Sequence, residues 1–235
     1  MNLNNLFKQD IKLIKDSHRY EHVEDPKFEF TSVTTFIDQF FKGFDAKKVA
    51  KKLISKYSKY SDYTVESLIE EWEETARYGT YVHEEIENWI RYNSHPKEVK
   101  SINGINWLKN YKLKSEYKIF PEMIIYSKEL KIAGTIDVLA LDKKTNQYDL
   151  IDWKTSKKIE TSAFGGKVGT KPATNTIPDC NYSHYTLQLS LYRYMLEEYY
   201  GLAIKNQFIA HLKEDYARGI EVPYMKDQII KMLGK

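Results

Sequence analysis

The stretch GTIDVLALDKKTNQYDLIDWKTSK, residues 134–157, contains two apolar segments on either side of a polar turn. The first segment, GTIDVLAL, is apolar on both faces, as expected for a strand inside a sheet. KKTN is a turn signal, and YDLIDWK has the composition of a second strand. The sequence therefore predicts a β-hairpin with a loop at residues 143–146.

The register of this hairpin decides where its charged residues lie. A four-residue loop at 143–146 pairs Asp137 with Asp152, and their Cβ atoms would then be about 5 Å apart. Period-2 alternation places Lys154 on the same face as Asp152. Two carboxylates this close repel each other, and burial increases the cost. We therefore expect a compensating cation, namely a divalent metal ion with Lys154 beside it.

A plainer interpretation of the same residues is also open. Asp152 and Lys154 would then form a surface ion pair on an edge strand, and Asp137 would be an ordinary polar residue with a hydrogen-bond partner. The apolar residues that surround all three in the sequence favour a buried site instead.

Composition and charge exclude several classes of protein. The chain has 235 residues, 42% of them hydrophobic and 29% charged, which is typical of a globular protein. Its net charge of +3 permits a nucleic-acid partner but does not require one. The single cysteine, Cys180, excludes an internal disulfide and a four-cysteine zinc or iron–sulfur site.

The sequence also bears on location. It contains no run of about 18 apolar residues, and its start lacks the apolar segment of a signal peptide. We therefore expect no membrane partner and an intracellular protein, either cytoplasmic or nucleoid-associated, or in the host cytoplasm if the chain is viral.

The periodicity changes along the chain. Helical patterns, with a weak point at Gly79, are followed by three strand-like segments, a helix and a fourth strand. This order predicts an α/β fold with a central mixed sheet of about four strands flanked by helices. The predicted organisation is an N-terminal arm at 1–30 and one domain at 31–235, with a helical part at 31–115 and an α/β core at 116–235.

Two further segments attract attention. Residues 155–183 are glycine- and proline-containing and irregular, which in a compact domain indicates a functional or disordered loop, and they begin directly after Lys154. A lysine run with interleaved tyrosines, at 47–60, would suit a phosphate backbone and stacked bases. The alternative for the lysine run is a solvated helix face.

Several of these residues resemble the PD-(D/E)XK nuclease superfamily. Asp137 in GTID and the sequence Asp152-Trp153-Lys154 match its two-part motif, although Ile136 replaces the proline. His83 in GTYVHEEIE, and a Q-x-x-x-Y spacing in LQLSLY, resemble the RecB-type branch.

The likeness extends over about residues 31–212. SVTT at 32–35 and IDWKTS at 151–156 are similar to segments of the mitochondrial genome maintenance exonuclease and of related phage and viral exonucleases. D-x-K alone is frequent by chance, whereas the ordered set on elements of the right type is specific. The resemblance implies a restriction-endonuclease-like core.

The resemblance also implies roles for individual residues. Asp137, Asp152 and Lys154 would be catalytic, with Mg²⁺ or Mn²⁺ held by the two aspartates and the backbone carbonyl of Trp153. His83 and Glu122, which follows Pro121 in the first strand, are further candidates for the metal. The candidates for bracing the site or binding DNA are Gln188, Tyr192, Lys157 and Lys158.

By this resemblance the protein would be a metal-dependent deoxyribonuclease that leaves 5′-phosphates. We expect an exonuclease on single-stranded DNA ends or flaps, in replication, repair or recombination. The alternative is a DNA-binding subunit with a nuclease fold that is inactive or that acts only when tethered to a helicase. Because the chain has no P-loop of the GxxxxGK[ST] type, any such motor must be another chain.

Overall fold

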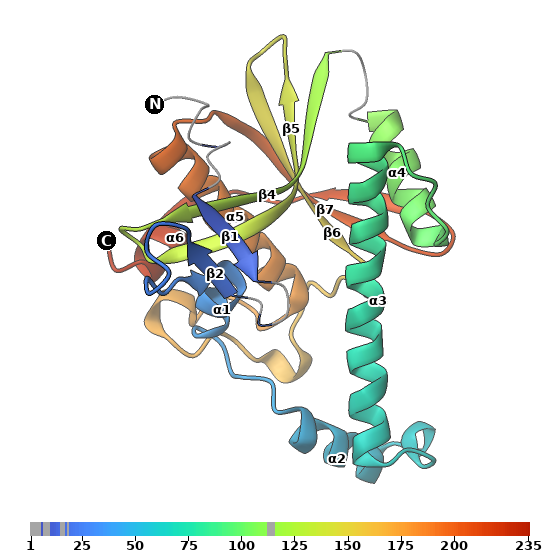
Figure 1. Cartoon of the computed structure of the whole chain (residues 1–235). Coiled ribbons are helices and arrows are strands. Elements are labelled where there is room, and N and C mark those ends of the chain that lie inside the picture. Colours follow the sequence, from blue (N-terminus) through green and yellow to red (C-terminus); the bar gives the residue numbers. More distant parts are fainter. Residues whose placement is uncertain (1–5, 7–9, 15–16, 18, 112–115) are drawn as a thin grey trace.

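A mixed sheet of six strands forms the centre of the computed structural model, which describes residues 6, 10–14, 17, 19–111 and 116–235. The strand order is β3-β5-β6-β7-β8, with β4 paired to β5 (Figure 1). The strands are β3 (Thr31–Ser32), β4 (Tyr117–Ser127), β5 (Ile132–Asp142), β6 (Gln147–Lys154), β7 (Ile204–Leu212) and β8 (Ala217–Glu221). The four expected strands are β4 to β7, and β3 and β8 extend the sheet.

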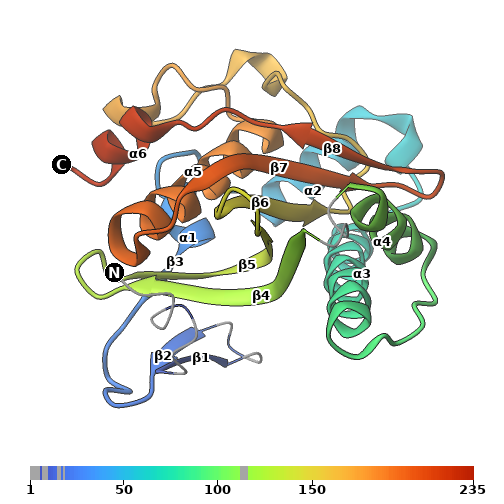
Figure 2. The ribbon, with the colours of Figure 1, turned by 90° about the horizontal axis from the view of Figure 1, so that it is seen from above.

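Helices cover both faces of this sheet, as Figures 1 and 2 show from two directions. Residues that alternate along β6 separate the two cores: Leu150 packs with α5, whereas Ile151 packs with α3 and α4. The α-helices are α1 (Val33–Asp38), α2 (Ala46–Lys56), α3 (Val65–Tyr92), α4 (Val99–Tyr111), α5 (Asn181–Tyr200) and α6 (Lys226–Met232). The short 3-10 turns are η3 (Ser58–Tyr60), η4 (Phe164–Gly166) and η5 (Pro172–Thr174).

The longest helix, α3, runs without a break through Gly79, where the sequence indicated a weak point. A Cβ atom at this position would lie 2.9 Å from Oγ1 of Thr155, so glycine lets the helix approach the segment that follows β6. Thr64 and Ser67 begin the helix with a capping box. In the described part of the chain, no helix has both the length and the apolar character needed to cross a bilayer.

The segment expected to be an N-terminal arm, 1–30, contains a small hairpin of β1 (Ile11–Ile14) and β2 (Arg19–His22). Ile11 and Tyr20 are buried in a cluster with Ala133 of β5. The hydroxyl of Tyr20 is 2.9 Å from that of Thr135. The apolar residues of this otherwise polar segment thus attach it to the central sheet.

The long segment after β6 is held in place by Phe40, two residues after the end of α1. The carbonyl of Phe40 accepts hydrogen bonds from the backbone N–H of Thr170 at 2.8 Å and from the hydroxyl of Thr174 at 3.0 Å. Thr174 is fully buried, and nearby Ile177 belongs to the core that contains α5. These hydrogen bonds and the apolar contacts of Ile177 therefore order this segment together.

Candidate metal and catalytic site

The β5–β6 hairpin has the register that the sequence predicted. Its turn occupies 143–146, and Val138 pairs with Ile151. Continuing this register by one position places Asp137 opposite Asp152. The regular backbone pairing of β5 with β6 ends at this point. Here the backbone N–H of Trp153 donates to Oδ2 of the Asp137 side chain, at 2.7 Å, instead of to a backbone carbonyl of β5.

Asp152 is held by two donors. Nζ of Lys154 lies 2.7 Å from Oδ2 of Asp152, and Nε2 of Gln188 on α5 donates to Oδ1 at 2.9 Å. Asp152 is only 3% exposed, and β6 lies between β5 and β7. The interpretation as a surface ion pair on an edge strand is therefore wrong, and Lys154 itself supplies part of the expected compensating charge.

A second cluster joins three elements beside this pair. His83 of α3, Glu122 of β4 and Asp137 of β5 each present a ligand atom, and these atoms lie within 4.8 Å of one another. Nδ1 of His83 is 3.5 Å from Oδ2 of Asp137. One imidazole nitrogen and two carboxylate oxygens form a donor set suited to a divalent cation.

Glu122 reaches this cluster from an irregular point in β4. Pro121 pairs with Val138 and Met123 pairs with Ile136, so the register is kept and Glu122 lies opposite Asp137, without a ladder pairing of its own. Its φ of 50° lies in the left-handed region, which is costly for a residue with a Cβ atom. The direction of Glu122, which the sequence left open, thus goes with this left-handed backbone conformation.

Arg91 holds this irregular point of β4 from the helical side. Its guanidinium donates to the carbonyl of Pro121 at 3.0 Å and pairs with Glu87 at 2.7 Å. Arg91 follows His83 by about two turns on α3, so the helix that presents His83 also holds the strand that presents Glu122. Sequence reasoning missed Arg91, because its partner is a backbone carbonyl distant in the chain.

Burial shifts the protonation of the site. Desolvation raises the pKa of Asp137 and of Asp152 to about 6, against the opposing effect of Lys154. Desolvation, together with the charge of Lys154, lowers the pKa of His83 to about 4. Burial alone would lower the pKa of Lys154, but Asp152 and Asp137 outweigh it and raise this pKa. His83 is therefore neutral near pH 7, as a metal ligand must be.

One face of α5 braces the site. Tyr192 is buried, and a Cβ atom on Gly134 would lie 2.6 Å from its ring, so the glycine of GTID makes room for it. Nζ of Lys154 lies 4.6 Å from the ring centroid of Tyr185. Sequence reasoning missed Tyr185, although it precedes Gln188 by three positions and so shares its helix face.

Trp153 and the two lysines of the next segment have different surroundings. The side chain of Trp153 points into the core between the sheet and the helices α3 and α4, where its ring centroid is 5.8 Å from that of Trp107. Lys157 and Lys158 are exposed, and their backbone carbonyls accept hydrogen bonds from Lys213 and Asn181. The structure therefore does not bring the side chains of these two lysines into the cluster.

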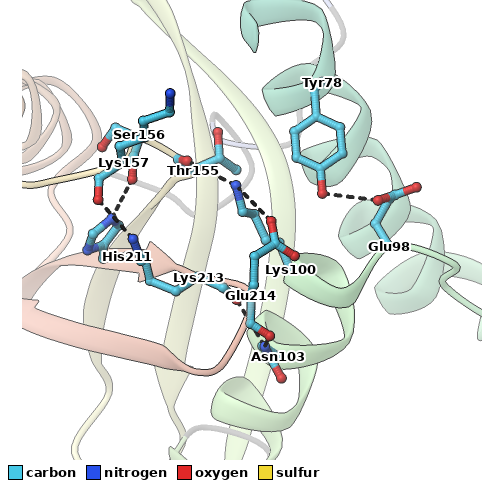
Figure 3. A network of polar contacts seen from close by, with 10 residues as sticks. All are labelled: Tyr78, Glu98, Lys100, Asn103, Thr155, Ser156, Lys157, His211, Lys213 and Glu214. Atoms are coloured by element: carbon cyan, nitrogen blue, oxygen red, sulfur yellow. Dashed lines mark hydrogen bonds and ion pairs between the residues drawn. The ribbon is translucent and has the colours of Figure 1, made fainter. Parts of the chain in front are cut away.

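A polar network holds the chain where it leaves β6 (Figure 3). His211 contacts the carbonyl of Ser156 at 2.6 Å, and Nζ of Lys213 donates to that of Lys157 at 2.9 Å. Lys100 of α4 lies 3.4 Å from the carbonyl of Thr155 and 3.4 Å from Glu214. These contacts fix the backbone immediately after Lys154.

The chain matches no protein-family model and no curated protein. Among solved structures, it is similar to the crystal structure of SSO0001 at 12% sequence identity and a TM-score of 0.40. The similarity covers 87% of this chain and 73% of SSO0001. A likeness this low carries no argument about function, and the α/β fold with its mixed, helix-flanked sheet stands on the topology described above.

Proposed function

We propose that the chain is a metal-dependent deoxyribonuclease with a PD-(D/E)XK core, acting as an exonuclease on single-stranded DNA ends or flaps. The observation that carries the proposal is the juxtaposition of two groups at one end of the β5–β6 hairpin. His83, Glu122 and Asp137 form a candidate cation site, and the buried Asp152–Lys154 pair lies beside it.

The donor set fits the proposed cation. Glu122 and Asp137 offer the oxygen ligands that Mg²⁺ and Mn²⁺ prefer, and His83 favours Mn²⁺ over Mg²⁺ because magnesium seldom takes nitrogen ligands. When bound, the cation would supply Lewis acidity and neutralise charge on a phosphodiester. Asp152 lies outside the three-residue cluster. Its main proposed role is therefore to hold Lys154, and it would contribute to the cation site only because it lies opposite Asp137.

The chain's own residues would position and stabilise the reacting groups. The Lys154 ammonium has three donors, of which Asp152 uses one, so it can orient a water molecule and stabilise negative charge on a phosphate oxygen. Gln188 keeps Asp152 in place, and the Trp153 N–H fixes the orientation of Asp137. Preorganisation of this kind is effective because little reorganisation is needed during the reaction.

The test is a cleavage assay with two substrates. Purified protein is incubated with end-labelled linear single-stranded DNA and with circular single-stranded DNA, in Mn²⁺, in Mg²⁺ and in EDTA. We expect the linear DNA to be degraded to products with 5′-phosphates in the presence of metal only, while the circles survive. The matched control is Asp137→Asn, which keeps the shape of the side chain and should abolish cleavage.

Two results would contradict parts of this proposal. Rapid cutting of the circles would replace the exonuclease by an endonuclease. Absence of metal-dependent cleavage, with DNA binding intact, would favour the inactive or helicase-tethered subunit.

A further inference from the structure

A pocket lies away from the hairpin, between α2, η3 and the segment that follows β6. Its volume is about 590 Å³. Val49, Leu53 and the aromatic residues Tyr57, Tyr60 and Phe164 form its apolar walls. Phe164 is 72% exposed and Tyr57 is 45% exposed, which is unusual for large rings that have no function at the surface. We call this feature the α2 pocket.

Positive charge surrounds these walls. Lys52, Lys56, Lys59 and Lys167 line the α2 pocket, and none of its described lining residues is acidic. Among the residues that the structure describes, these four lysines form no ion pair with a carboxylate, whereas Lys100, Lys144 and Lys226 do. The four charges are therefore available to an anionic ligand.

The lysines and the rings lie close enough to act on one ligand. Nζ of Lys52 is 5.5 Å from the ring centroid of Phe164, and Nζ of Lys59 is 4.8 Å from that of Tyr60. Phe164 precedes Gly165 and Gly166, both at positive φ, so a tight turn presents its ring across the pocket from α2. Phosphates alternating with flat aromatic bases are the chemistry that matches such a surface.

The two sides of the α2 pocket are also connected to the candidate catalytic site. The chain runs from η3 into α3, which presents His83 about 27 Å further along its axis, and from Lys154 into the segment that carries Phe164. The ring of Phe44, just before α2, packs at a tilt against that of Trp72 on α3, with ring centroids 5.5 Å apart, so α2 is attached to that helix. A ligand that reached both places would have to be an extended polymer.

We infer that the α2 pocket is a second binding site for single-stranded nucleic acid, in which lysines hold phosphates and Phe164, Tyr57 and Tyr60 stack on bases. The inference rests on the proposed function for the identity of the polymer. It adds a site that grips the strand at a distance of several nucleotides from the bond to be cut. Duplex DNA does not fit, because its bases are already stacked and paired.

The inference is tested by binding without cleavage. Fluorescence anisotropy with labelled oligo(dT) of about 20 nucleotides is measured in EDTA over a range of salt concentrations. Lys52→Ala/Lys56→Ala should weaken binding about tenfold and reduce the salt slope by about 1.4, because two phosphate contacts are lost. The matched control is Lys48→Ala/Lys51→Ala, which removes the same charge from α2 outside the pocket and should change affinity by less than about twofold.

Substitutions of Phe164 test the stacking. Phe164→Ala should weaken binding of oligo(dT) by about 5- to 100-fold with an unchanged salt slope, and Phe164→Trp should retain it. An abasic oligonucleotide should bind the wild type weakly, and Phe164→Ala should not change its affinity further. Equal loss in the two lysine pairs, no effect of Phe164→Ala, or equal competition by polyglutamate would each overturn the inference.

These outcomes separate the two proposals. If the wild type cleaves DNA but no substitution in the α2 pocket changes its affinity for DNA, this inference is overturned and the proposed nuclease function stands. A wild type that binds through the pocket but never cleaves would overturn the nuclease and leave the binding site.

Discussion

Lys154 is the residue whose surroundings most directly suggest a chemical role. Its ammonium is paired with Asp152, lies over the ring of Tyr185 and is close enough to Asp137 for the carboxylate charge to raise its pKa. We expect Lys154→Ala to reduce turnover by about 10²–10³-fold, because a charge-stabilising donor is lost. The measurement is single-turnover cleavage of labelled DNA in Mn²⁺.

Lys144→Ala is the control for this substitution. Lys144 lies in the turn of the same hairpin, where it forms a surface ion pair with Glu116. The Lys144→Ala protein should cleave DNA at the wild-type rate. If Lys154→Ala also does so, the resemblance of Asp152-Trp153-Lys154 to a nuclease motif has no catalytic meaning.

The two aspartates should differ in what they contribute to stability. Asp152→Asn leaves the Lys154 cation without its partner at 2.7 Å, and breaking such a pair should cost about 2 kcal/mol in unfolding free energy. Asp137→Asn can still accept from the Trp153 N–H and removes a carboxylate that burial disfavours, so it should stay within about 0.5 kcal/mol of wild type. Urea unfolding in EDTA measures both, and the reverse ranking would contradict the assignment.

At the level of the element, the left-handed residue Glu122 in β4 makes a specific prediction. Glu122→Gly keeps a residue that tolerates φ of 50° but removes the carboxylate from the cluster. We expect the gain in melting temperature on addition of Mn²⁺ to be largely lost. Asn146→Gly, at φ of 55° in the hairpin turn, is the matched control and should keep the full gain. An undiminished gain in Glu122→Gly would remove Glu122 from the proposed metal site.

The junction of α1 and α5 predicts a dependence of stability on pH. His184 lies 3.5 Å from Asp38 and 3.0 Å from Asp179, and packs on the ring of Phe41. Burial lowers the pKa of His184, but the hydrogen bonds that its imidazole donates to the two aspartates outweigh it, and the net direction is upward.

Because this pKa is raised on folding, the stabilisation is complete below the unfolded value of about 6.5 and is lost as the pH rises through the folded value. Wild type should therefore exceed His184→Gln in stability by more at pH 5.5 than at pH 8.5. Thermal melts at both values, each with EDTA, provide the comparison. A difference that grows with pH would contradict the ion-pair account of this junction.

At the scale of the whole molecule, the proposed cation would connect the two layers. Its ligands come from α3 on one side and from β4 and β5 in the sheet, so binding should stabilise the folded state as a unit. At Mn²⁺ concentrations of about 100 times its Kd, the expected gain is about 2.7 kcal/mol, which corresponds to a Tm increase of about 5–10 °C. Asp137→Asn should gain much less, and an unchanged wild-type melt would argue against a metal site.

Much of the site could be predicted from the hairpin alone. The alternation of apolar residues and the length of the polar turn determine the register, and the register places Asp137 opposite Asp152 with Lys154 on the same face. These are local relationships, because strand period and loop length depend only on residues near one another in the chain. The same local signals predicted β4 to β7 and the long helices.

Only the tertiary structure decided which distant residues complete the site. The left-handed conformation of Glu122 opposite Asp137, the contact of Arg91 with the carbonyl of Pro121, and the support of Lys154 by Tyr185 were not visible in the sequence. The last two depend on how α3 and α5 pack on opposite faces of the sheet. The α2 pocket likewise joins segments about a hundred residues apart. Such contacts arise from three-dimensional packing and leave no periodic signal in the sequence. The local pattern of apolar and polar residues does not distinguish the residues that make these contacts from several other surface residues.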